Sequence, residues 1–236
     1  YRDSMSRLIA CYELYQLQNA TVGEEVVFGA YEQDNNLSNG MELIEWIVLA
    51  KVNDQVLLLS KYALDCQPFN EVWEDTSWEK CTLRTWLNNT FYYTAFDESE
   101  QQKIALTSVG ADKNLMYYNV NPGKDTQDNV FLLSISETDK YFTSDNARSC
   151  LATSYAAAQG AYVTSDMGCW WWLRSPVGMS SHTVDYAENS ALYVDDNGNC
   201  SSASVQTILS IRPVMWIDLK ALEAMFLDEF LANIQF

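Results

Sequence analysis

Apolar residues follow a helical period at the start of the chain and change to β-rich runs from Val22. Residues 1–18 carry Leu, Cys and Tyr side chains three to four positions apart, which predicts an amphipathic helix. The run EEVVFGAY then predicts one strand. IEWIVLAKVNDQVLLLSKYAL predicts a hairpin, because two β-rich runs flank a turn at Asn53-Asp54.

The middle of the chain reads as helices and loops. Thr76-Ser77-Trp78-Glu79 fits a capping box and predicts a helix whose buried face includes Leu83, Trp86 and Leu87. NVFLLSI, from residue 129, predicts a strand, and Ser136 is the expected cap of the helix that follows it. SYAAAQG predicts another helix, closed by its final glycine.

The last third returns to β-type runs. WWWLRS, ALYV and IRPVMWIDL predict three strands, and Pro213 restricts the last one to an edge or to a strand start, because proline has no N–H to donate. The tail KALEAMFLDEFLANIQF is amphipathic. The order of these runs predicts an α+β fold with short helices and a mixed, mostly antiparallel sheet. We therefore divide the chain into a helical segment over 1–20, one domain over 21–219, and an amphipathic tail over 220–236.

The charge of the chain narrows its partners. Lys and Arg number 14 and Asp and Glu number 32, a formal net charge of −18. This balance argues against binding to nucleic acid or to anionic membrane surfaces, because both depend on clustered basic residues. No apolar run approaches the roughly 18 residues that span a bilayer, so direct membrane insertion is not expected. The opening YRDSMSRL has neither a start methionine nor a signal peptide, and we expect an excised piece of a longer protein.

The supply of catalytic and metal-binding side chains is small. The single histidine, His182, excludes a His-rich metal site within this chain, and no carboxylate pattern accompanies it. The six cysteines contain no CxxC pair, so disulfides and free thiols both stay open. No DxDxDG-type calcium loop occurs. We assign no catalytic residue, no metal ligand and no cofactor.

Aromatic and arginine residues of the last third are expected to form a scaffold. Adjacent side chains of a strand point to opposite faces, so Trp170, Trp171 and Trp172 cannot share one face. Most of these rings are expected in the core. Arginines beside strand ends, in LRSP and IRP, are expected to fasten loops through carboxylates and carbonyls. The predicted scaffold comprises Trp170, Trp171, Trp172, Arg174, Arg212 and Trp216.

Several motifs together resemble an uncharacterised bacterial domain family. They are VVFGAYEQDN, EWIVLAKVNDQVLLLSKYALDCQPFN, TSWEKCTLRTWLNNTFYYTAF, VFLLSISETDKYF and the closing WWWLRSP…IRPVMWIDL. The resemblance covers roughly Val22 to Leu219. The opening YRDSMSRLIACYE resembles the last helix of helical repeats that often precede this domain.

The resemblance implies a C-type-lectin-like fold, shared with relatives of formylglycine-generating enzymes. It also suggests a scaffold diversified by retroelements, in which adenine-directed mutagenesis changes selected codons. Between Pro176 and Ile211 the composition is mixed, and many of its residues are reachable from Asn codons, while WLRSP and IRPVMWI stay family-like. Ordinary variation of a loop is the alternative explanation.

These observations predict a non-catalytic ligand-recognition domain. The expected partner is a protein or another surface ligand, and a cell-surface or extracellular location is favoured. An enzyme with a carboxylate-based site, or with a cysteine site such as Cys169 with Cys200, is the alternative, and a purely structural module is the third. The predicted ligand contacts are Met179, Ser181, His182, Thr183, Asp185, Tyr186, Tyr193, Asp195 and Gln206.

Overall fold

A computed structural model describes residues 12, 15–114, 116, 120–177 and 189–221 of the chain. The predicted N-terminal helix is described over 15–19, where the backbone is helical, and a helical turn over 219–221 begins the predicted tail. The rest of both segments lies outside the described residues. Among the described helices, none combines the length and apolar character that a membrane crossing requires.

The first sheet joins the beginning and the end of the domain. It contains β1 (Glu25–Tyr31), β2 (Glu42–Val52), β3 (Gln55–Ser60) and β11 (Val214–Asp218), in the order β1-β2-β3-β11. All three pairings are antiparallel. The predicted hairpin is confirmed: β2 and β3 are joined through Asn53, whose φ of 53° suits the tight turn.

The second sheet is formed mainly by the last third of the chain. Its strands are β4 (Asp65–Pro68), β7 (Trp171–Val177), β8 (Ser190–Val194), β9 (Cys200–Ser204) and β10 (Ile208–Ile211). Their order is β4-β10-β7-β8-β9, and only the β10–β7 pairing is parallel. A third, two-stranded sheet pairs β5 (Thr107–Val109) with β6 (Thr126–Asp128). The strand pairings are mixed but mostly antiparallel and the helices are short, so the predicted α+β class is confirmed.

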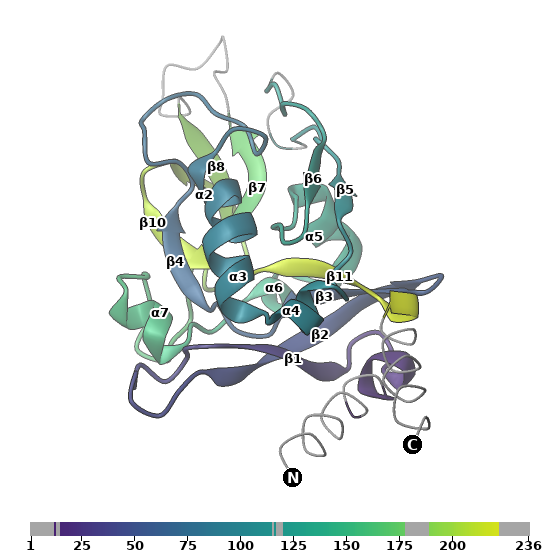
Figure 1. The fold of residues 1–236 in the computed structure, drawn as a ribbon. Helices are drawn as coiled ribbons and strands as arrows, with labels where there is room; N and C mark the ends of the chain where they lie inside the picture. The colour runs from purple at the N-terminus through teal and green to yellow at the C-terminus, as the bar shows by residue number, and fades with distance from the viewer. Residues whose placement is uncertain (1–11, 13–14, 115, 117–119, 178–188, 222–236) are drawn as a thin grey trace, which may run out of the picture.

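One predicted strand is two strands in different sheets. IRPVMWIDL divides at Arg212-Pro213: β10 ends before this pair in the five-stranded sheet, and β11 begins after it in the four-stranded sheet (Figure 1). The Pro213 carbonyl accepts a 2.9 Å hydrogen bond from the amide of Ser60. β11 is an edge strand of its sheet, as expected for a strand that follows proline.

A continuous helical stretch covers one side of the second sheet (Figure 1). It consists of α2 (Thr82–Trp86), the π-helix η1 (Leu87–Phe91) and α3 (Tyr92–Ala95). The predicted start of α2 is wrong, because Cys81 is its N-cap and no side chain caps the helix. Residues 76–79 precede it as a loop.

The later helices have clear caps. α4 (Glu98–Gln101) begins with a capping box between Asp97 and Glu100. α5 (Ile135–Tyr141) has a second box between Ser134 and Glu137, so the expected cap at Ser136 is wrong by two positions. α6 (Asp145–Arg148) and α7 (Ser154–Ala158) follow, and Gly160, with φ of 111°, closes α7 as predicted. The strand predicted from residue 129 is absent; there only Phe131 makes a β-bridge, to Val214.

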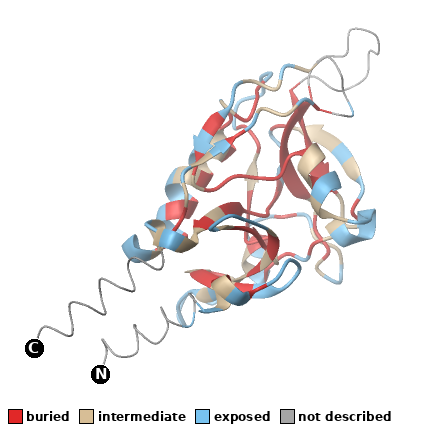
Figure 2. Cartoon of the chain, turned by 90° about the vertical axis from the view of Figure 1, so that its right-hand side faces the viewer, coloured by how far each residue is buried: buried red, intermediate tan, exposed pale blue. Residues whose placement is uncertain are grey.

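Large rings fill the interior, and buried residues gather along the strands (Figure 2). Trp171 and Trp172 are both fully buried although they point to opposite faces of β7. Their indole N–H groups donate to the carbonyls of Arg148 and Gln67, at 3.1 and 3.0 Å. Both faces of β7 are therefore covered.

Candidate ligand-recognition surface

The strands β7 and β8 hold both ends of the segment in which most ligand contacts are predicted. The two strands are antiparallel neighbours, and Val177 lies opposite Ser190. Every residue of both strands is buried. The chain therefore leaves the sheet after residue 177 and returns to it at the same place, with both strands fixed by the core.

A turn at residues 205–207 lies against this end of the sheet. The amide of Val205 donates to the carbonyl of Asn189 at 2.8 Å, directly before β8 begins. Gln206 is exposed, and its side-chain amide donates to the carbonyl of Glu71 at 2.8 Å. The structure thus places the turn that carries Gln206 beside Asn189, the residue directly before β8.

Hydrogen bonds to the same turn, residues 205–207, hold a second loop, residues 70–75, at this end of the sheet. Asn70 is buried, its amide donates to the Val205 carbonyl at 2.9 Å, and its side chain donates to the carbonyl of Val72 at 2.8 Å. The loop presents Val72 and Trp73 to solvent, 57% and 59% exposed. Three exposed carboxylates flank these apolar side chains in the sequence: Glu71, Glu74 and Asp75.

A third loop meets the end of β7. The buried side chain of Asn114 donates to the carbonyl of Pro176 at 2.8 Å, and its Oδ1 accepts from the amide of Met116 at 2.9 Å. Met116 is 46% exposed. Figure 1 shows the loops around α2 and before β6 at the same end of the molecule as the end of β7. We call the exposed side chains of Val72, Trp73, Met116 and Gln206 the loop surface.

Arg174 fastens the third loop to the sheet. Its guanidinium donates to the carbonyl of Leu132 at 2.7 Å and to that of Gly110 at 3.4 Å. It also pairs with Asp112, at 3.3 Å, and with Glu137. With a side chain only 4% exposed, Arg174 links β7, α5 and the loop that continues to Met116.

Arg212 joins the two sheets where the chain crosses between them. Its Nε donates to the carbonyl of Ser60 at 2.9 Å, and its guanidinium lies 5.2 Å from the ring centre of Trp171 and 5.8 Å from that of Phe142. Trp216 is half-buried in β11, and its carbonyl accepts from the amide of Ala105 at 2.8 Å.

The predicted contacts are not all brought together. Tyr193 is buried; its ring stacks on Trp170, with ring centres 4.9 Å apart, and meets Trp172 edge-on. Asp195 organises its own turn by accepting the amides of Asn197 and Asn199. Both lie toward the end of β8 that pairs with Trp171, away from the end where Ser190 pairs with Val177. The remaining predicted contacts lie outside the described residues: Met179, Ser181, His182, Thr183, Asp185 and Tyr186.

Val72, Trp73 and Met116 are not among the contacts predicted from the sequence. A usable signal existed for Trp73, because EVWED places one large ring among acidic residues between a strand and a helix. Aromatic residues are enriched at recognition surfaces.

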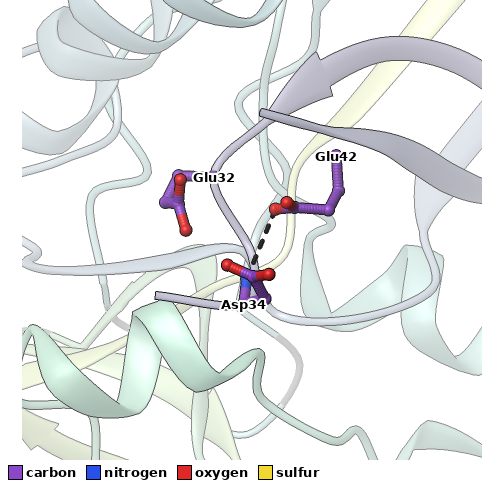
Figure 3. A group of neighbouring side chains, drawn as sticks. All are labelled: Glu32, Asp34 and Glu42. Atoms are coloured by element: carbon purple, nitrogen blue, oxygen red, sulfur yellow. Dashed lines mark hydrogen bonds between the residues drawn. The ribbon is translucent and has the colours of Figure 1, made fainter. Parts of the chain in front are cut away.

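Among the described residues, one group of carboxylates has suitable chemistry for a divalent cation. Glu32, Asp34 and Glu42 point toward one another across the β1–β2 loop, with one oxygen of each within 4.8 Å of the others (Figure 3). Loop amides already satisfy these oxygens: Glu42 accepts from the amides of Gln33 and Asp34, and Glu32 accepts from that of Asn36. The side-chain hydrogen bond from Asn39 lowers the pKa of Asp34. The group is explained as the hydrogen-bonded framework of its own loop.

Cys169 and Cys200 have different neighbours. Cys200 is half-buried and its sulfur lies 3.4 Å from the Arg148 guanidinium, whereas the Cys169 thiol donates to the carbonyl of Cys150 at 3.4 Å. Burial raises the pKa of the Cys200 thiol. A nucleophilic thiolate at Cys200 is therefore disfavoured.

Comparison with curated proteins gives no match, and comparison with solved structures gives none either. A family model does match, over residues 53–219, which include both strands that bound the 178–188 segment and every residue of the loop surface. The chain belongs to the family described as a domain of unknown function, DUF6273.

Proposed function

We propose that this domain is a non-catalytic ligand-recognition module with a C-type-lectin-like fold, which binds a protein ligand through the loop surface and the adjoining segment 178–188. One observation carries the proposal. The loop that carries the exposed Trp73 and the turn that carries the exposed Gln206 are joined by two hydrogen bonds, from the Asn70 amide to the Val205 carbonyl and from the Gln206 side chain to the Glu71 carbonyl. They lie where the fully buried strand β7 ends and the fully buried strand β8 begins. A rigid sheet that carries loops is the usual architecture of a recognition site.

The fold assignment is supported by the arrangement of the strands. The first and last described strands, β1 and β11, belong to one sheet, while the connections that form the loop surface lie at the far end of the other (Figure 1). The motifs WWWLRSP and IRPVMWIDL, on which the resemblance rests, supply the central strand of the second sheet and the strands on either side of the crossing.

The chemistry of the loop surface favours a cationic ligand with apolar side chains. Trp73 offers a large rigid ring, of the kind that contributes most to binding energy in protein interfaces. The exposed carboxylates of Glu71, Glu74 and Asp75 adjoin it, on a chain of net charge −18. Complementary charge accelerates association and makes it sensitive to salt.

Peptide selection tests this proposal. A random peptide library is selected against the full chain, and the enriched peptides are measured with Trp73→Ala and with Leu37→Ala. Leu37 is the matched control, because it is 79% exposed but lies in the β1–β2 loop. We expect Lys- or Arg-containing peptides whose affinity falls at least about tenfold with Trp73→Ala and with rising salt, and stays unchanged with Leu37→Ala.

Two results would contradict it. One is the failure of any peptide to be enriched over the empty support, and the other is equal loss of binding in both variants. Retroelement diversification, which we propose for the region between Pro176 and Ile211, has a separate test. A reverse transcriptase gene beside an Asn-rich near-copy of the segment from Trp170 to Ile217 would support it, and substitutions spread evenly over all codons among sister clones would refute it.

A further inference from the structure

Two buried cysteines face each other across a short antiparallel contact that the proposed recognition function does not use. Leu151 forms a β-bridge with Gly168, and the flanking hydrogen bond runs from the amide of Cys169 to the carbonyl of Cys150, at 2.9 Å. One position beyond the bridge, this register places Cys150 opposite Cys169. Residues that face each other in an antiparallel pair point to the same side.

The backbone arrangement meets the requirement of a disulfide. Facing residues joined by antiparallel hydrogen bonds have Cα atoms about 5.5 Å apart, within the roughly 4.4–6.8 Å found across disulfides. The Cys169 sulfur already lies over the opposite segment, because its thiol donates to the Cys150 carbonyl at 3.4 Å.

The surroundings favour a thiolate on one member of the pair. Burial opposes ionisation of Cys150, yet the adjacent Cys169 thiol and the positive charge of Arg212 lower its pKa below the ordinary value of a thiol. The pKa of Cys169 is raised, first because its thiol donates to Cys150 and then because it is buried. The two thiols are therefore neighbours, and the cation beside them favours the thiolate form.

The other described cysteines do not share this arrangement. Burial raises the pKa of Cys66 to about 11 and that of Cys81 to about 12. Cys66 lies opposite Ser210 in the pairing of β4 with β10, and the Cys81 thiol contacts the carbonyl of Trp78. Among the described residues, only Cys150 and Cys169 have each other as thiol partners.

We propose that Cys150 and Cys169 form a disulfide that fastens the segment before α7 to the start of β7. The oxidant is a disulfide such as oxidised glutathione. As the chain folds, the thiolate of one of the two cysteines attacks a glutathione sulfur, the glutathione S–S bond breaks and one glutathione thiol leaves. The thiol of the other cysteine then loses its proton and attacks the protein sulfur of the mixed disulfide, releasing the second glutathione. Two protein thiols are oxidised and one glutathione disulfide is reduced to two thiols.

The bond closes a ring of the chain that contains α7, and it lies next to the region where the two sheets meet. Arg212, which binds the Ser60 carbonyl from the crossing between the sheets, is the cation next to the pair. Cys150 and Cys169 are only 4% and 0% exposed, so the bond has to form as the chain folds and is then shielded from reductants. Cross-linking a ring of this size restricts the unfolded chain and stabilises the folded one.

Cysteine mapping tests the proposal. The full chain is reduced in denaturant, refolded in a glutathione redox buffer, blocked with N-ethylmaleimide in denaturant and digested without reduction for mass spectrometry. We expect one cross-linked peptide pair, which joins Cys150 to Cys169, and alkylation of Cys66, Cys81 and Cys200. Alkylation of both Cys150 and Cys169, or a cross-link of either to another cysteine, would overturn the proposal.

Thermal unfolding supplies the second measurement, with matched variants. The oxidised wild type should unfold about 5–10 °C above the reduced wild type. The double variant Cys150→Ser/Cys169→Ser should show no such difference, and Cys200→Ser should retain it. Equal midpoints for oxidised and reduced wild type would show that the bond does not fasten the folded state. Neither readout depends on a ligand.

Discussion

The Tyr31 hydroxyl donates a 2.5 Å hydrogen bond to Oδ2 of Asp65, and this contact joins β1 of the first sheet to β4 of the second. Both side chains are buried, 7% and 5% exposed. The other carboxylate oxygen of Asp65 accepts from the amide of Cys66 at 2.7 Å. Burial raises the pKa of Asp65 despite these hydrogen bonds, and it raises the pKa of Tyr31, to which the nearby Asp65 charge also contributes.

The raised pKa of Asp65 predicts that acidification stabilises this part of the fold. The folded state holds the carboxyl proton more tightly than the unfolded state, so the contribution of Asp65 to stability falls as pH rises from about 4 through the folded-state pKa. Asp65→Asn removes the titrating proton and keeps an oxygen acceptor for Tyr31. Urea unfolding between pH 4 and 7 should show wild type losing stability relative to Asp65→Asn as pH rises. Parallel curves would contradict the prediction, and Asp75→Asn, an exposed loop residue, is the control.

The raised pKa of Tyr31 predicts a loss of stability at alkaline pH. The unfolded chain releases this proton near pH 10, while the folded chain retains it, so stability falls as pH rises above about 10. Tyr31→Phe should be less stable than wild type at pH 8, because Asp65 loses its donor. It should also lose less additional stability than wild type between pH 9 and 11. Urea midpoints at these pH values measure both effects, and an unchanged alkaline slope in Tyr31→Phe would assign the loss to other groups.

Apolar runs were sufficient to predict most strands but not their partners. The segment from Phe131 to Leu133 has the apolar pattern of a buried strand, yet its hydrogen bonds go to two sheets. The Phe131 amide donates to Val214 of β11, and the Leu133 carbonyl accepts from the amide of Arg174 in β7. No β-ladder forms here, because each partner strand makes backbone hydrogen bonds with only one residue of the segment. The pattern records burial, which this segment shares with a strand, and carries no information about pairing.

The candidate surface was predictable only in part for the same reason. The adjacent tryptophans predicted a strand that is covered on both faces, because neighbouring side chains of a strand point to opposite faces. The loop surface, in contrast, depends on contacts between distant parts of the chain. Gln206 is held by Glu71, and Met116 is positioned through Asn114 and Pro176. Spacing along the sequence contains none of these relationships.

Gly29 is predicted to be sensitive to substitution because of a close approach. Its φ is 70°, and an added Cβ would lie 2.6 Å from the Phe96 ring and 2.8 Å from the Ala95 carbonyl oxygen. Gly40 has a similar φ of 93° with nothing within 4 Å, so Gly40→Ala isolates the cost of the backbone conformation. We expect Gly40→Ala to lower the free energy of unfolding by about 1–2 kcal/mol. Gly29→Ala should lower it by about 1–3 kcal/mol more than that. Equal free energies of unfolding would show that the ring moves aside freely.

Replacement of the buried carboxylate of Asp128 is predicted to lower the stability of the fold strongly. Its side chain is fully buried and accepts from Arg84 Nε at 2.6 Å, Trp78 Nε1 at 2.9 Å and Thr126 Oγ1 at 2.6 Å. Asp128→Ala leaves these donors without their acceptor, and we expect a loss of about 3–5 kcal/mol in the free energy of unfolding. Asp128→Asn should lose less, because one oxygen acceptor remains.

An exposed ion pair provides the control for Asp128. Lys124 lies 3.8 Å from Glu79 with its side chain 84% exposed, and Lys124→Ala should change stability by no more than about 0.5 kcal/mol. Trp78 belongs to the same loop region as Trp73, so release of its indole should also loosen the loop surface. Peptide affinity at a temperature where Asp128→Asn remains folded should therefore fall while Lys124→Ala binds normally. Unchanged affinity in Asp128→Asn would show that Asn70 and Gln206 are sufficient to hold the loop.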